Sequence, residues 1–438
     1  MKLVKSLLLG SAAGLAAVAG AQAADLPAKK AAPVEYVRVC STYGAGFFYI
    51  PGTETCLRVG GRVRADYLYG EPLDRSDDAI GFRARGRLNI DARTATAYGL
   101  LRAYVRFELT RSSGTPFGAE GGIGTSSQVQ QAFVQFGGLT AGRVTTFFDN
   151  GDLPTGHMGT LRFSDAPDVD LLAYTFSFGN GFSATLSLED GLERRNNGFV
   201  AGGLAANALV YAGQRVPDVV GNVKYTGTWG TAQLSAALHQ LRSDNLVTPF
   251  GSPLGYATFP DTEYGFAIQA NVGINLPMLA PGDAMWINAV YADGALGYIT
   301  GGSANSIGAG DVAGFLVDGY INPVTGNIVR GKGWSIAGGL RHYWTPQIRQ
   351  NVFGSYARFE YGAGAATLNA AGNYIGLNDF NEWRVGTNVF WQPVAGLDLG
   401  VEVIYAKIDP RGRVALPDGR TIGSDNAWEG RLRVQRDF

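Results

Sequence analysis

Apolar and polar residues alternate along the segment from Leu57 to Thr110, in three consecutive runs. In the first run Val59, Val63 and Tyr67 share one side of the chain, and charged residues occupy the positions between them. A period of two residues predicts a β-strand, because successive side chains of a strand point to opposite faces. The runs at 82–93 and 101–109 repeat the pattern. The arginines of the three predicted strands all share one face: Arg58, Arg62, Arg64, Arg83, Arg85, Arg87, Arg93, Arg102 and Arg106.

This pattern fits two kinds of protein. In a soluble β-sandwich the apolar face would form the core, and the arginines would be solvated on the outside. In an outer-membrane barrel the apolar face contacts lipid instead, and the charged face lines a water-filled lumen. The rest of the chain has to decide between them.

The alternation continues to the end of the chain and predicts sixteen strands. Their expected ranges are 57–69, 81–94, 99–110, 126–137, 139–147, 171–179, 182–189, 219–229, 231–240, 262–275, 284–293, one strand on each side of Thr345-Pro346, 380–391, 397–408 and 427–438. Connections alternate between short turns, such as Gly179-Asn180-Gly181, and long loops. We expect the longest loop, 294–332, to be mobile because Gly, Ala, Ser and Asp dominate it. An even strand number lets the last strand pair with the first, which favours a 16-stranded antiparallel transmembrane β-barrel over residues 57–438.

Composition and the first residues support export. The 63 glycines are about twice the average share of roughly 7%, as expected for long sheets with many turns. Lys2 and Lys5 precede the apolar stretch 7–19 and the motif Ala21-Gln22-Ala23, which predicts a signal peptide over 1–23. Beyond it, no stretch holds the ~18 uninterrupted apolar residues of a spanning helix. The 36 basic and 37 acidic residues nearly balance, so charge gives no reason to expect a nucleic-acid partner.

The two cysteines, Cys40 and Cys56, lie in a predicted periplasmic N-terminal segment, 24–56. In an oxidising compartment an isolated pair is most simply a disulfide, and two unrelated free thiols are the alternative. Two cysteines without a nearby histidine are too few for a structural zinc site.

Both ends of the chain resemble the general porins of alphaproteobacteria, the rhizobial type. The matching motifs are ADLP at 24–27, VCSTYGAGF at 39–47, YIPGTETCL at 49–57 and RLRVQRDF at 431–438. The resemblance implies a multi-pass porin of the bacterial outer membrane, a homotrimer, with Phe438 as the signal shown to the barrel assembly machinery. Arg436 departs from the pattern, because many such barrels carry an aromatic or apolar residue third from the end. Expected partners are outer-membrane lipid and lipopolysaccharide, the assembly machinery and further copies of the chain.

In porins of this type the third long loop folds inward and narrows the channel, which places the constriction loop at 149–170. We expect its carboxylates to face arginines across water: the acids are Asp149, Asp152, Asp165, Asp168 and Asp170, and the wall is formed by Arg62, Arg64, Arg83, Arg85, Arg87, Arg102 and Arg106. Arg143, in Ala141-Gly142-Arg143, resembles the Gly-Arg that anchors this loop. Charged rings of this kind tune ion preference.

Catalytic and metal sites find little support. The chain has three histidines and no Gly-x-Ser-x-Gly elbow, so its sequence offers no pairing of a nucleophile with a general base. Asp168-Val169-Asp170 lacks the other ligands of a calcium-binding loop. We therefore expect no enzyme, no cofactor and no metal. The sequence predicts a water-filled passive diffusion channel for small hydrophilic solutes and ions. The alternatives are a substrate-selective outer-membrane channel and, from another class, a secreted all-β adhesin or binding protein.

Overall fold

The computed structural model describes residues 38–72, 75–196, 209–248, 257–302, 306–322, 324–362, 365–368, 374–415 and 420–438. The predicted signal peptide, 1–23, and the first part of the predicted periplasmic segment lie outside the described residues. None of the helices in the described ranges has the length and apolar character needed to cross a bilayer.

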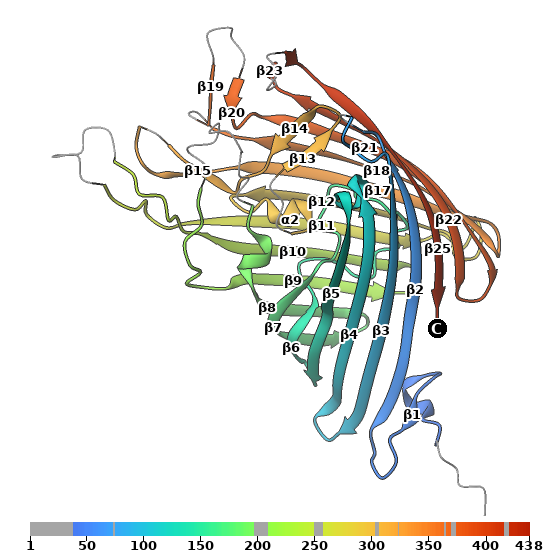
Figure 1. The fold of residues 1–438 in the computed structure, drawn as a ribbon. Helices are drawn as coiled ribbons and strands as arrows, with labels where there is room; N and C mark the ends of the chain where they lie inside the picture. Colours follow the sequence, from blue (N-terminus) through green and yellow to red (C-terminus); the bar gives the residue numbers. More distant parts are fainter. Residues whose placement is uncertain are drawn as a thin grey trace, which may run out of the picture. The chain divides into compact units, whose positions relative to one another are not determined.

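Sixteen long strands of the described chain form one closed antiparallel sheet (Figure 1). They are β2 (Cys56–Gly70), β3 (Ile80–Thr96), β4 (Gly99–Gly114), β5 (Ala119–Phe136), β6 (Leu139–Thr145), β7 (Asp168–Gly179), β8 (Phe182–Glu189), β9 (Asp218–Gly227), β10 (Gly230–Leu241), β11 (Glu263–Asn275), β12 (Ala284–Asp293), β17 (Lys332–Thr345), β18 (Ile348–Glu360), β21 (Phe380–Val394), β22 (Leu397–Pro410) and β25 (Asp425–Asp437). Each predicted strand is present, which confirms the predicted fold class.

The barrel closes between its first and last strands. β25 pairs with β2 from Arg62 opposite Asp437 to Gly70 opposite Glu429, and Figure 1 shows the two strands side by side. The chain end completes the seam, because Gly61 donates its amide to the carbonyl of Phe438 at 2.8 Å. Closure leaves neither terminal strand with an open edge along the paired stretch, as a lipid environment requires.

The barrel is apolar outside and polar inside. Along β21, Trp383 and Val385 are 48% and 56% exposed, whereas their neighbours Glu382, Arg384 and Asn388 are at most 8% exposed. A soluble sandwich would show the opposite distribution. The nine arginines that share one face of β2, β3 and β4 therefore line the lumen, and the exposed apolar face is the lipid-facing surface of a transmembrane barrel.

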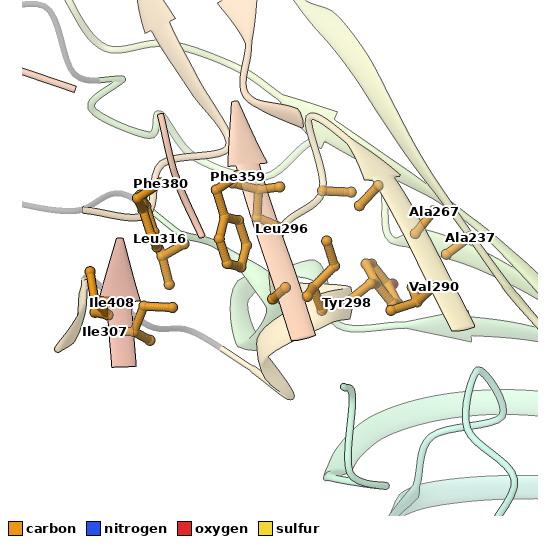
Figure 2. Packing of buried hydrophobic residues seen from close by; sticks show 14 of the residues in the cluster. Ala237, Ala267, Val290, Leu296, Tyr298, Ile307, Leu316, Phe359, Phe380 and Ile408 are labelled. Carbon is orange, nitrogen blue, oxygen red and sulfur yellow. The ribbon is translucent and has the colours of Figure 1, made fainter. Parts of the chain in front are cut away.

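The expectation that 294–332 is mobile is wrong for its described part. We call residues 294–331 the sixth loop; it contains α2 (Gly297–Thr300), β13 (Ser306–Ala309), β14 (Val312–Phe315), β15 (Gly319–Ile321) and β16 (Ile328–Arg330). Leu296 and Tyr298 are fully buried and belong to one apolar cluster with Ala237, Ala267 and Val290, which lie on the inner faces of β10, β11 and β12 (Figure 2). Small side chains on these strands leave room inside the barrel, and apolar residues of the loop occupy it.

Shorter elements lie in other connections. They are η1 (Ser41–Tyr43), β1 (Phe48–Tyr49), η2 (Thr115–Phe117), η3 (Gly191–Arg194) and a small sheet of β19 (Ala366–Leu368), β20 (Tyr374–Gly376), β23 (Val414–Ala415) and β24 (Thr421–Ile422). None of these was predicted, because segments of two to four residues are too short for alternation to be visible.

The described part of the N-terminal unit is held by a disulfide between Cys40 and Cys56, as predicted, with Cα atoms 6.0 Å apart. Phe47 is buried with the two cysteines in a small apolar cluster of its own. The bond closes a loop across a sequence separation of 16 residues, and closure of a loop of this length contributes ~3 kcal/mol in the chain-entropy model.

Replacing both cysteines by serine should therefore loosen this unit alone. In C40S/C56S we expect amide hydrogens of residues 40–56 to exchange substantially faster, because the ~3 kcal/mol of loop closure is lost. Exchange in the barrel strands is the internal control and should stay unchanged. Equal protection of residues 40–56 in both proteins would mean that packing around Phe47 suffices to hold the unit.

Candidate functional site

Arginines from four adjacent strands form a wall on the inner face of the barrel, and carboxylates are shared among them. Asp66, on β2, pairs with Arg83 of β3 at 2.7 Å and with Arg433 of β25 at 2.6 Å. The Asp66 side chain has no exposed surface. The negative charge of the buried carboxylate offsets the charge of one of its two guanidinium neighbours, so one net positive charge remains at this point.

The same arrangement recurs twice along the wall. Glu108 lies 2.7 Å from Arg87 and 3.2 Å from Arg85. Asp91 is shared by Arg93 and Arg102, at 2.8 and 2.9 Å. Each shared acid holds two guanidiniums in place, so the wall keeps a surplus of positive charge.

Two wall arginines are held by neutral side chains. Arg64 donates to the amide oxygen of Gln435 at 2.8 Å. Arg106 donates to the amide oxygen of Asn89 at 3.1 Å and to the hydroxyl of Tyr104 at 2.9 Å. Neutral acceptors orient a guanidinium without cancelling its charge, so these two side chains add directly to the positive potential of the lumen.

The third loop (146–167), which connects β6 to β7, runs inside the barrel. Near its start, the Asn150 amide donates to Thr231 of β10 at 3.0 Å and to Asn271 of β11 at 2.9 Å. Farther along, the amides of Met158 and Gly159 both donate to Glu402 of β22 at 2.6 Å. The loop therefore crosses the lumen from β6 to the inner face of β22.

Buried contacts hold the middle of the third loop against that face. Arg162 forms an ion pair with Glu382 of β21, in which the Glu382 side chain has no exposed surface. Leu161 and Phe163 pack with Trp286 of β12 and with Phe353 of β18. Sequence reasoning missed Glu382 and Glu402. Their inward positions on predicted strands were readable, but the loop that they hold was not.

The predicted constriction acids do not share one environment. Asp149 is 7% exposed and accepts hydrogen bonds from Ser164 at 2.6 Å and from Gln269 at 2.9 Å. Asp152 pairs with Lys224 of β9 at 2.7 Å, and Asp165 lies 3.8 Å from His157. The side chains of Asp152 and Asp165 are both 52% exposed, so these two loop acids remain open to solvent.

Asp168 and Asp170 belong to β7 rather than to the loop, which ends three residues earlier than the predicted 149–170. Asp168 accepts from Gln130 at 2.8 Å and from Gln131 at 2.6 Å. Asp170 lies 3.8 Å from Arg143. Asp168 therefore links β7 to β5, and Asp170 links β7 to β6, near the base of the loop.

Arg143 pairs with Asp170 and with Glu193 of η3, and so connects β6 to the fourth loop (190–217). Among the described residues, neither ion pair of Arg143 reaches the third loop. Asp170, Asp190 and Glu193 bring their ligand oxygens within 4.8 Å of one another. Because the Arg143 guanidinium already pairs with two of these carboxylates, a metal ion there would compete with it.

A second polar cluster fixes the fourth and sixth loops to each other. Asp318 of the sixth loop accepts from the Leu296 amide at 2.6 Å, the Asn196 amide at 2.5 Å and the Tyr211 hydroxyl at 2.7 Å. Burial raises the pKa of Asp318 to about 6. Tyr211 also lies 3.0 Å from the ring of His239 on β10, so the cluster ties both loops to the wall.

Two cavities flank the arginine wall inside the barrel. One, of about 260 Å³, is lined by Arg58, Arg93, Arg102 and Tyr104 near the short β3–β4 turn. The other, of about 450 Å³, lies among the long loops and is lined in part by Leu68 and Ile404. Both cavities leave open space beside charged side chains of the inner face.

Comparisons with known proteins agree with this geometry. The family model described as "Porin subfamily" matches residues 25–429. The chain is 30% identical to the porin Omp2b of Brucella canis over 446 residues, covering 99% of each chain. It is also 30% identical to the porin Omp2a of Brucella suis over 456 residues, covering 99% of this chain and 100% of the relative. The fold is similar to that of the outer membrane channel DcaP of Acinetobacter baumannii, with a TM-score of 0.61, 17% identity and coverage of 89% and 99%.

Burial of Asp149 makes the packing of the third loop depend on pH. Burial raises the pKa of its carboxyl from 3.8 to about 7. A carboxyl whose pKa is higher in the folded state favours that state at low pH, and the contribution is lost as pH rises through about 7. We expect the protection factors of the amides of residues 146–167 in detergent, which are corrected for the intrinsic pH dependence of exchange, to be larger at pH 5 than at pH 8.

Asp149→Asn is the matched variant, because it keeps the shape and removes the titration. Its protection factors for the same residues should vary much less with pH. If protection in the wild type rose with pH instead, the ion pair of Asp149 with Arg194, at 3.7 Å, would outweigh the cost of burial.

Proposed function

The chain belongs to the porin subfamily, and on that premise we propose that its inner arginine wall sets the ion preference of the channel. Membership confirms the resemblance found in the sequence, and the protein is an outer-membrane porin, a water-filled diffusion channel. The alternative of a secreted adhesin or binding protein is set aside by the family. The family consists of channels rather than enzymes, and we propose that this chain has no catalytic activity.

The observation that carries the proposal is the sharing of acids along the wall. Asp66, Asp91 and Glu108 each serve two arginines, and Arg64 and Arg106 are held by neutral side chains. The surplus is positive, so the wall should favour anions where the path narrows. Asp152 and Asp165 of the third loop are the acids available to face it, and together they would produce a transverse field.

The sharpest test removes the two wall arginines that are held by neutral side chains. In R64Q/R106Q we expect the anion-over-cation permeability ratio to fall about threefold, because a unit charge at 4 Å contributes ~1 kcal/mol even in bulk water and salt screens part of it. The measurement is the reversal potential of single channels under a KCl gradient.

Arg111→Gln is the control, because Arg111 lies on the same strand as Arg106, β4, but is exposed on the outer face with Leu109. It should leave the reversal potential unchanged. A double variant that behaves like this control would place the wall away from the narrowest point. Substitution of Arg85 and Arg87 would be harder to interpret, because it would also leave Glu108 buried without these two ion-pair partners.

We also propose that the protein is a homotrimer whose contact surface includes β5. β6 pairs with β5 only through Ala132–Phe136, so in the described chain the preceding part of β5 is bonded to β4 on one side and open on the other. An open edge in a membrane needs a partner. Small outward residues on β2, β3 and β4 allow close approach: Ala65, Ala84, Gly86 and Ala103. Gly61, expected to belong to this set, is buried beneath the ring of Phe438. The number three rests on the family resemblance.

A charge at the open edge should dissociate the oligomer. Val129 is 45% exposed on β5, and Val223 is 55% exposed on β9. In V129D we expect most of the oligomer seen by native electrophoresis in mild detergent to be lost, whereas V223D should keep it. Equal behaviour of the two variants would place the contact elsewhere on the barrel.

Phe438 is 64% exposed at the end of β25, where it is available for recognition during assembly. We propose that it is the signal read by the barrel assembly machinery, and that outer-membrane lipid and lipopolysaccharide contact the remaining apolar surface. Accessibility of the terminal ring and the exposed apolar bands support these partners.

A further inference from the structure

The cavity of about 450 Å³ among the long loops has a character that the arginine wall does not explain. Its lining comes from the loop between β2 and β3, from η2 and its flanks, from the β13–β14 hairpin and from the inner faces of β21, β22 and β25. We propose that this cavity binds a small organic cation, an amine or guanidine with a compact apolar body. The proposal rests on the porin function and adds a solute class to it.

Much of the cavity floor is apolar, although it lies inside the barrel. Leu68 on β2 and Ile404 and Ala406 on β22 all point inward and are at most 7% exposed. The lumen face of a porin barrel is normally polar. Packing of the β13–β14 hairpin accounts for part of this apolar surface, since Val312 belongs to the same cluster as Ala406. The apolar lining that stays open comes from Pro116, Ala313 and Ala427, which are at least partly exposed, and it suits the apolar body of a solute.

The charged residues around this floor are mostly acidic. The acids that line the cavity are Glu71, Asp77, Asp78, Asp311 and Glu429. Glu71 accepts from the Trp428 amide at 3.0 Å, and Asp78 accepts from the Gly121 amide at 3.3 Å. Backbone donors fix these two carboxylates in place but do not neutralise their charge, so both can attract a cation.

Basic groups offset only part of this charge. Arg384 lines the cavity, but it pairs with Glu382 at 2.8 Å and donates to the Thr160 carbonyl at 3.2 Å. Asp311 lies 3.6 Å from Arg420, and Glu429 lies 2.9 Å from Arg431. Glu71 and Asp78 thus contribute the net negative charge that an ammonium or guanidinium group complements.

The position of the cavity determines what binding would do to the current. A cation held there would next meet the positive wall, which repels it, so it should dwell in the mouth instead of crossing. An inorganic cation would interact with the carboxylates but not with the apolar lining. A neutral organic solute would contact the apolar lining but would not interact with the carboxylates as a cation does. Block by an organic cation is therefore the expected signature.

The probe is 2-phenylethylamine, charged at neutral pH, applied to single channels of the full-length protein from the long-loop side. For a ligand of this size we expect half-block at roughly millimolar concentration. The isosteric alcohol 2-phenylethanol should give no block at tenfold higher concentration. In E71Q/D78N the half-block concentration should rise about tenfold, since two screened charges are lost.

Asp244→Asn is the matched control, because Asp244 is an exposed acid that belongs neither to the lining of this cavity nor to the third loop. Its half-block concentration should equal that of the wild type. Ala406→Asp is a second test that leaves both acids in place: it breaks the apolar floor and should weaken block by the amine despite the added negative charge.

Equal block of wild type and E71Q/D78N, or equal block by amine and alcohol, would overturn the cation site. A conducting channel that the amine does not block would overturn this inference and leave the porin function intact. Loss of all conductance from the wild type would instead contradict the porin function itself.

Discussion

The structure depends on one constraint, which is that backbone amides and carbonyls cannot remain unpaired in hydrocarbon. The sheet meets it by joining β25 to β2 over nine residue pairs, from Arg62 opposite Asp437 onward. Once the sheet is closed, its two faces have unequal surroundings. The face with Trp383 and Val385 meets lipid, and the face with Glu382 and Arg384 must border water or other polar groups. The inverted distribution of charge, and with it the existence of a channel, follows from closure.

A barrel of sixteen strands encloses more space than its own inward side chains fill. Two loops occupy part of this space in different ways. The third loop is held largely by buried polar contacts, such as those of Glu402 with two consecutive amides. The sixth loop is held largely by apolar packing of Leu296 and Tyr298 against small residues of the wall. Between these loops and β2–β4, the arginine wall stays hydrated because its acids are shared and cannot neutralise it.

Much of the architecture was predictable because strand alternation is a local property. The strand 182–189 was predicted with its exact limits, and β25 was displaced by one or two residues. The disulfide was predictable from compartment and spacing. Alternation placed the predicted arginines on one face of three strands, but it did not include Arg433, which contacts Asp66 across 367 residues of chain. That contact exists only because the barrel closes.

By itself, the sequence determined which residues share a face, how many strands form and why the two ends must meet, because each of these depends on neighbours a few positions away. Only the tertiary structure decided which way the loops turn. Asp149 and Asp152 lie three positions apart in one loop, yet one is buried against Gln269 and the other is half exposed beside Lys224. Arg162 pairs with Glu382, which lies 220 residues later in the sequence. Loop residues have no period to indicate their direction, so the burial of each carboxylate is set by the wall against which the loop happens to pack.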